Sequence, residues 1–312
     1  NGTALAPGRR GKLELNWKVP HGDMVDGTHW ADCPEGKPFF AQLHFHEAHR
    51  DYEADPSHPI DPDEVEFPPY YPDHRITRLI WALYLETMQI LDKKVGRVLD
   101  KLEEAGLAEN TVVFFMGDNG RDMVRGLQFC YDPGLHVPLI VRWPGEIEPG
   151  SRVTEQVSGI DLAPTWMRIA GVQPPEHIQG QDLFTSGGRE YIYAARDRCD
   201  ETDDRVRAVR TNRFKYLRNF HPMRPYMQRN MWKRQKFPIW TLLQVMHDRG
   251  ELTPEQENLV QPYRPVEELY DLREDPHEVH NLAEDPAYEK QLKKMQGKLY
   301  DWICRTGDQG QI

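Results

Sequence analysis

Two adjacent polar residues in this chain have the chemistry of metal ligands. Asp118 and Asn119 directly follow an apolar run, residues 111–116, and Gly120 comes next. A carboxylate and an amide oxygen are hard oxygen donors, which Ca²⁺ and Mg²⁺ prefer. Asn-Gly is also typical of a tight turn, because both residues tolerate positive φ angles. The local sequence therefore leaves two interpretations open, a metal site and a turn.

Three histidines lie in or just after a second apolar run, residues 39–45. Side chains alternate between the two faces of a strand, so His44 and His46 would share one face, whereas His49 lies beyond the strand. A histidine in that position can hold an anion or protonate a leaving group near neutral pH. The alternative is a histidine with a purely structural role.

The elements between these two groups predict that they meet. Residues 39–45 and 111–116 are short apolar runs that predict strands, and apolar residues recur at helical spacing between Asp73 and Gly106. Strand, helix and strand in this order make a βαβ unit, whose two strands run parallel. Because the carboxyl ends of parallel strands share one edge of a sheet, where α/β proteins bind ligands, we expect the histidines and the Asp118-Asn119 pair to line one site.

The rest of the chain predicts a loop beside this site and a change of structure near residue 190. Residues 51–72 contain six prolines, which predicts a long irregular loop. Near residue 190 the pattern changes from apolar strands separated by helices to short β-like pieces. We therefore divide the chain into residues 1–189 and residues 190–312, and expect a last amphipathic helix at about 286–304.

Charged residues near these elements are candidates for contacts with an anionic substrate. Arg121 and Arg125 follow the proposed metal ligands, and either anion binding or solvated surface charge would account for them. Asp197 and Arg198 belong to a charged cluster that opens the second domain. They are candidate substrate contacts, and a surface salt-bridge group is the alternative.

Composition excludes several classes of function. The chain has 312 residues and a net charge of -11, so its far field would repel nucleic acid and anionic membranes. No apolar run approaches the ~20 residues that span a bilayer. The four cysteines include no C-x-x-C pair, which argues against a zinc knuckle or a redox dithiol.

Five blocks of the sequence, taken in order, resemble the type I sulfatases of the alkaline phosphatase superfamily, and the tail is most similar to the heparan sulfamidases and related bacterial sulfatases. The blocks are residues 38–50, 110–120, 137–145, 160–165 and 268–283. The resemblance implies an α/β fold with a mostly parallel sheet flanked by helices, and a smaller C-terminal α+β domain with an antiparallel sheet and a packed helix. It also implies a periplasmic, extracellular or lysosomal compartment.

The same resemblance implies a site and a chemistry. One Ca²⁺ would have Asp118 and Asn119 among its ligands, and His49 would contact the sulfate with His46 beside it. The substrate would be a sulfated carbohydrate. The nucleophile of the family is a hydrated formylglycine, made from Cys or Ser in a C/S-x-P/A-x-R motif, and the metal stabilises the oxygens of the transferring group.

Two departures from the family pattern stand out. None of the four cysteines lies in the nucleophile motif, so we expect the formylglycine and the remaining half of the metal ligands upstream of Asn1. The chain alone would then be inactive. The family also places a lysine or arginine eight residues after the ligand asparagine, where this chain has Leu127. Arg125 is the candidate to replace it.

Two other functions stay open at this stage. The chain could be a non-catalytic remnant or subunit that binds a sulfated sugar or a partner chain, and a homo-oligomer is compatible with the sequence. It could also act on a phosphodiester or phosphonate, a related reaction of the same superfamily. Asn119 favours the sulfatase, because a histidine at that position would favour zinc or a two-metal site.

Overall fold

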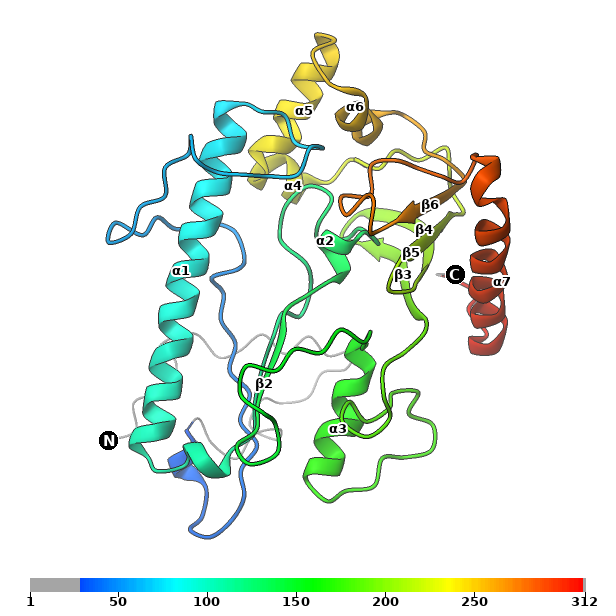
Figure 1. Ribbon diagram of the computed structural model, residues 1–312. Helices are drawn as coiled ribbons and strands as arrows, with labels where there is room; N and C mark the ends of the chain where they lie inside the picture. Colours follow the sequence, from blue (N-terminus) through cyan, green and yellow to red (C-terminus); the bar gives the residue numbers. More distant parts are fainter. Residues whose placement is uncertain (1–28, 311–312) are drawn as a thin grey trace. The chain divides into compact units, whose positions relative to one another are not determined.

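A computed structural model describes residues 29–310 of the chain (Figure 1). The Cα positions group into two compact units, one made of Asn1–Asp61 and Ala82–Val112 and the other of Pro62–Trp81 and Val113–Ile312. The first 28 residues of the predicted 1–189 domain lie outside the described residues, and the boundary near 190 stays a prediction. Across the described range, no helix combines the length and the apolar character needed to cross a bilayer.

The long helix α1, Arg75–Glu104, confirms the prediction from the apolar spacing. It ends where Gly106 adopts a φ of 69° and donates its N–H to the carbonyl of Glu103 at 2.8 Å. Before its start, the Asp73 carboxylate accepts two hydrogen bonds from the Arg78 guanidinium, at 2.6 and 2.8 Å. The ring of His74 caps the helix by accepting the N–H of Ile76 at 3.1 Å.

The predicted strand over residues 39–45 is wrong, and with it the βαβ unit. These residues form neither strand nor helix, although a one-turn 3₁₀ helix, Trp30–Asp32, precedes them. An extended segment becomes a strand only when its backbone pairs with a neighbouring strand. Within residues 29–310, the segment has no such partner.

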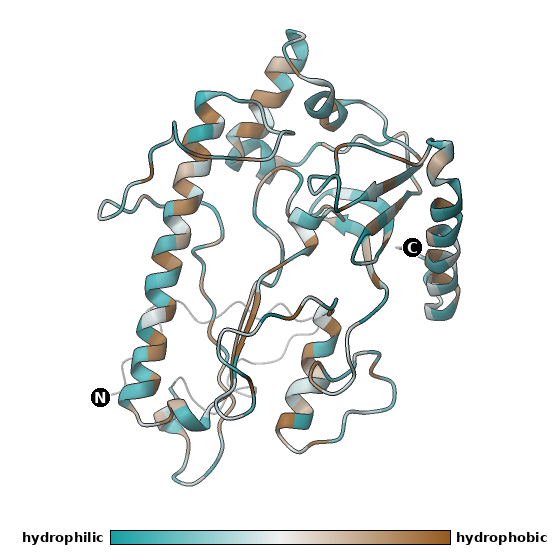
Figure 2. Cartoon of the chain, viewed as in Figure 1, coloured by the Kyte–Doolittle hydropathy of each residue, from teal (hydrophilic) through white to brown (hydrophobic). Residues whose placement is uncertain are grey.

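The predicted strand over residues 111–116 does form, and it pairs with a second strand over residues 139–142. After a short 3₁₀ turn, Ala108–Asn110, β1 (Val113–Met116) runs antiparallel to β2 (Leu139–Arg142). Both strands are strongly hydrophobic (Figure 2). The short helix α2, Asp132–Leu135, lies in the connection between them, and the 3₁₀ turn Gly159–Asp161 and helix α3, Leu162–Ile169, follow.

A four-stranded antiparallel sheet with a helix on one face makes up much of the C-terminal half, as the resemblance implied. Its strands, in spatial order, are β3 (Ile192–Cys199), β4 (Thr202–Arg210), β5 (Phe214–Asn219) and β6 (Glu267–Asp271). The last helix, α7 (Glu289–Thr306), packs Met295 and Leu299 against Val209, Tyr216 and Leu269 of the sheet (Figure 1). A 3₁₀ turn, Pro286–Tyr288, leads into this helix, close to its predicted start.

Three short helices lie between β5 and β6, namely α4 (Met231–Lys236), α5 (Pro238–Asp248) and α6 (Pro254–Val260). Residues 51–72 have no regular structure, as the prolines predict. The end of that loop is nevertheless fixed, because Tyr70 and Tyr71 are fully buried and Gln256 donates hydrogen bonds to the carbonyls of Pro69 and Tyr71, both at 3.2 Å. The loop is therefore irregular but packed.

Candidate functional site

Asp118 and Asn119 lie in the turn that follows β1, and both are exposed. The amide nitrogen of Asn119 donates a hydrogen bond to the carbonyl of Gly120 at 2.8 Å, and this bond does not use the amide oxygen, the atom that binds a cation. Gly120 makes the turn possible, because a Cβ there would lie 2.1 Å from the Pro133 carbonyl oxygen and 2.4 Å from Gly134 Cα. The tight turn and the exposed pair of oxygen donors are therefore compatible, and one does not exclude the other.

This pair fits a Ca²⁺ site as a part of the ligand set. Ca²⁺ takes 6–8 oxygen ligands, and carboxylate and amide oxygens are suitable donors. Asp118 and Asn119 supply two adjacent side chains of this kind. Among residues 29–310, no group of three or more His, Cys, Asp or Glu side chains is arranged to hold a metal.

His46 and His49 lie together in a tight turn of the first unit. The N–H of His49 donates to the carbonyl of His46 at 2.8 Å, and both residues are exposed. Nδ1 of His49 lies 2.7 Å from the carbonyl oxygen of Arg50. Glu47 forms an ion pair with Lys94 of α1, which anchors the turn to the helix. The ring of His49 is thus held by the carbonyl of the next residue, and His49 remains exposed to solvent.

The loop after the proposed metal ligands closes on itself. The N–H of Leu127 donates to the carbonyl of Arg121 at 2.9 Å, and the N–H of Gly126 to that of Met123 at 3.0 Å. The guanidinium of Arg121 lies 5.2 Å from the ring centre of Trp81, and its side chain is half-buried. Arg121 therefore stays close in sequence and space to the Asp118-Asn119 turn.

Arg125 has a different role from the one expected. It is buried, its Nη1 donates to the carbonyl of His277 at 2.8 Å, and its Nη2 donates to the carbonyl of Glu278. Its guanidinium carbon lies 3.9 Å from the ring centre of Tyr131 and 4.7 Å from that of Tyr70. A sulfate would have to displace these partners, so the geometry favours a structural role over substrate binding.

Asp197 and Arg198 lie on β3, and the contacts of Asp197 favour the alternative of a salt-bridge group. Asp197 Oδ1 is 2.8 Å from the guanidinium of Arg207, which also binds Asp308 at 2.6 Å. Arg198 is exposed, and its Nε donates to the carbonyl of Asp200 at 2.9 Å. Of this pair, the Arg198 side chain is the more accessible to a substrate.

Lys233 of α4 is a residue of interest that the sequence did not reveal. It is only 2% exposed, and its Nζ lies 3.4 Å from the carbonyl oxygen of Leu127. Burial, together with the nearby Arg196 guanidinium, lowers the pKa of Lys233 to about 7. α4 has only six residues, too few to show an apolar face, so a lysine among other basic residues looked like surface charge.

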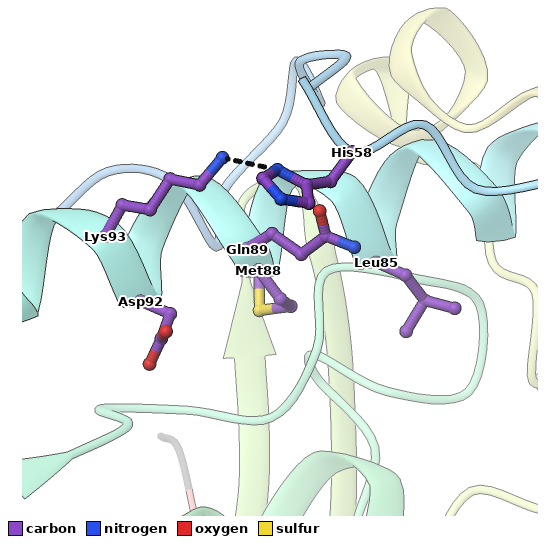
Figure 3. A pocket seen from close by; sticks show the side chains of 6 residues that line it. All are labelled: His58, Leu85, Met88, Gln89, Asp92 and Lys93. Carbon is purple, nitrogen blue, oxygen red and sulfur yellow. Dashed lines mark hydrogen bonds between the residues drawn. The ribbon is translucent and has the colours of Figure 1, made fainter. Parts of the chain in front are cut away.

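The first unit contains a separate hollow, which includes none of the predicted site residues (Figure 3). It is lined by His58, Leu85, Met88, Gln89, Asp92 and Lys93. Nζ of Lys93 lies 3.3 Å from Nδ1 of His58 and 2.6 Å from Asp55. The hydrogen bond from Lys93 lowers the pKa of Asp55 to about 2. These contacts fasten the loop to α1 and give the hollow a structural role.

Comparison with known proteins extends the resemblance found in the sequence. A family model described as Sulfatase matches residues 10–172, and one described as the C-terminal part of N-sulphoglucosamine sulphohydrolase matches residues 126–252. The chain is 37% identical over 253 residues to an ulvan-active sulfatase of Formosa agariphila, covering 80% of this chain and 42% of that protein. It is 27% identical over 316 residues to human N-sulphoglucosamine sulphohydrolase, covering 88% of this chain and 62% of that protein.

The solved structures agree on the fold. A 2-O GAG sulfatase superposes with a TM-score of 0.56 at 23% identity, over 87% of this chain and 54% of that chain. This similarity confirms the predicted sulfatase-like α/β fold class. The chain spans about half the length of the curated relatives it matches, with shares of 42%, 44% and 62% of the first three.

Proposed function

The chain belongs to the sulfatase family, and from this premise we propose that it takes part in hydrolysing the sulfate ester or sulfamate bonds of sulfated sugars. The observation that carries the proposal is the exposed pair Asp118 and Asn119 at the end of β1, inside the segment that matches the family. Two exposed side-chain oxygens held by a turn that requires Gly120 are suited to a metal ion, and the bond from the Asn119 amide nitrogen to Gly120 leaves the amide oxygen available.

In this proposal Asp118 and Asn119 supply part of the ligand set of one Ca²⁺. When bound, the ion provides positive charge that stabilises the oxygens of the sulfuryl group. His49 contacts the sulfate and can donate a proton to the leaving group, with His46 beside it. The backbone contacts of the 46–49 turn orient the His49 ring, and its exposure allows a substrate to reach it.

The formylglycine nucleophile is proposed to come from outside residues 1–312. No cysteine of the chain lies in the family's nucleophile motif. Burial raises the pKa of the Cys130 thiol to about 11, and it also raises that of Cys199. A thiol with a raised pKa is a poor nucleophile, because the thiolate is the reactive form. These two cysteines are therefore unsuited to replace the missing group.

The proposed substrate is a sulfated carbohydrate. The Formosa relative is named for activity on ulvan and the human relative for N-sulphoglucosamine, and both names denote sulfated sugars. Arg121 and Arg198 are the proposed substrate contacts, since both are at least partly exposed. Asp197, which already pairs with Arg207, is proposed to position this region.

An assay of the full-length gene product tests the proposal. Release of sulfate would be followed from sulfate esters and sulfamates of sugars, with a phosphonate monoester as the competing substrate class. We expect sulfate release that requires Ca²⁺ and is lost in Asp118→Ala. Preferred turnover of the phosphonate would identify the protein as a phosphonate hydrolase of the same superfamily. Binding of sulfated sugar without turnover would support a non-catalytic role.

A further inference from the structure

The amino group of Lys233 is buried and forms no ion pair within the described residues. Within residues 29–310, no acidic oxygen lies at ion-pair distance from its ammonium, and its one hydrogen bond, to the Leu127 carbonyl, is long at 3.4 Å. Lys215 is buried to the same degree but lies 2.7 Å from Glu278 and 2.5 Å from Asp132. An uncompensated buried charge lowers stability, so its presence calls for a reason outside packing.

Aromatic rings surround this ammonium. Nζ of Lys233 lies 4.9 Å from the ring centre of Phe129, 5.4 Å from that of Trp240 and 6.0 Å from that of Phe237. Ring faces attract a cation but accept no strong hydrogen bond. The rings therefore hold the ammonium in place without satisfying its N–H groups.

Two hydrogen-bond donors near Lys233 lack an acceptor within the described chain, although Nη1 of Arg196 lies 3.5 Å from Asp204. The Arg196 guanidinium lies 5.4 Å from the ring centre of Phe129, the ring that Lys233 also contacts, and its Nε is buried without a partner within the described chain. The indole Nε1 of Trp240 is likewise buried without an acceptor there. Buried donors are nearly always paired, so these two, together with the single long hydrogen bond of Lys233, indicate a place for an acceptor with several oxygens.

The cluster adjoins the loop that follows the proposed metal ligands. Lys233 contacts the carbonyl of Leu127, whose N–H binds the carbonyl of Arg121, two residues after Asn119. Leu127 is partly exposed, so the buried charge lies close to the surface of this loop. Position 127 itself offers an apolar side chain, and Arg125 is held by other partners.

We propose that Lys233, with Arg196 and Trp240 beside it, binds an anionic oxygen of the sulfuryl group and supplies the positive charge that position 127 lacks. The inference rests on the proposed function and assigns a binding residue from the second half of the chain to the same site. Burial and then Arg196 lower the pKa of Lys233, while Cys199, Asp122 and Asp200 raise it in part, and the resulting pKa is about 7. A bound anion would raise this pKa again.

The test compares two variants of the full-length protein. Lys233→Met removes the charge and keeps the length of the side chain, and Arg234→Met removes the neighbouring exposed charge of the same helix. We expect Lys233→Met to weaken inhibition by inorganic sulfate and to raise KM for a sulfated sugar, each at least tenfold. Arg234→Met should change both by less than twofold. Lys233→Met should also unfold at a higher temperature than the wild type at pH 6.

A folded Lys233→Met protein with unchanged sulfate inhibition would overturn the proposal. If that variant does not fold, the wild-type protein can be tested instead, labelled with ¹³C-lysine so that the pKa of Lys233 can be followed. Inorganic sulfate should raise this pKa. An unchanged pKa would refute anion binding at Lys233. This measurement needs no turnover. A pKa that responds to sulfate in a protein that hydrolyses no sulfate compound would refute the proposed enzymatic function and leave the anion site standing.

Discussion

Nζ of Lys215 lies 2.7 Å from Oε1 of Glu278, and both side chains are fully buried. The other carboxylate oxygen of Glu278 accepts the N–H of Asp132 at 2.7 Å, and Lys215 also binds Asp132 at 2.5 Å. The three residues join β5, the start of α2 and the segment after β6. Removing one partner of such a group leaves an unbalanced charge in the interior.

Lys215→Met should therefore lower the free energy of unfolding by about 3–5 kcal/mol, the cost typical of breaking a buried ion pair. Denaturant unfolding would measure the change. Lys294→Met is a suitable control, because that ammonium is exposed and lies 3.9 Å from Glu190, and its loss should cost less than ~1 kcal/mol. A similarly small effect at Lys215 would contradict the assigned role.

Asp308 should make the stability depend on pH in the acid range. Hydrogen bonds from Arg207 lower the pKa of Asp308 from 3.8 to about 2. A lowered folded-state pKa contributes stability that is fully present above about 3.8 and is lost as the pH falls towards about 2. Asp308→Asn should thus be less stable than the wild type at pH 7, and the gap should close between pH 4 and pH 2. A gap that stays constant across this range would exclude the ion pair as its cause.

Asp118→Ala and Asn119→Ala should each reduce kcat/KM for a sulfated sugar by at least about a hundredfold in the full-length protein, because each removes a donor to an ion that stabilises the transition state. Excess Ca²⁺ should restore part of the activity if the loss is one of metal affinity. Both side chains are exposed, so thermal unfolding without metal should change little. The exposed Asp248 gives a control, and Asp248→Ala should keep full activity.

Arg121 and Arg125 should separate into a binding and a structural residue. Arg121→Met should raise KM for the sulfated sugar while changing the unfolding free energy by about 1 kcal/mol, because its cation–π contact with Trp81 is partly exposed. Arg125→Met should lower the unfolding free energy by roughly 2–4 kcal/mol, because it leaves the carbonyls of His277 and Glu278 without their buried donor. Steady-state kinetics and denaturant unfolding of both variants would show the split. Equal effects on KM would contradict it.

Local sequence patterns predicted the elements whose formation is indicated by their own residues. The apolar spacing before Gly106 predicted α1, and the run 111–116 predicted β1. The segment 39–45 failed, because its strand character depends on a neighbour that the described residues do not supply. Apolar composition indicates that a segment can pair but does not identify its partner.

The positions of the candidate site residues could be predicted where they adjoin an element and not where they depend on tertiary contacts. Asp118 and Asn119 follow β1, so their exposed position could be read from the strand that ends before them. Arg125 looked equivalent to Arg121, and only the folded chain shows its bonds to residues 277 and 278. Lys233 gave no signal, because its burial depends on Phe129, more than a hundred residues earlier.

The close approach of Gly120 to the Pro133-Gly134 backbone has a consequence for how the protein can vary. A Cβ at Gly134 would also lie 2.3 Å from the Phe129 carbonyl oxygen. The backbone of Gly134 therefore packs directly against the backbone at Gly120 and at Phe129, with no room for a side chain. Homologous or engineered proteins could exchange many surrounding side chains to suit a new sugar while these two glycines stay invariant. The turn would then act as a fixed frame within which specificity can evolve.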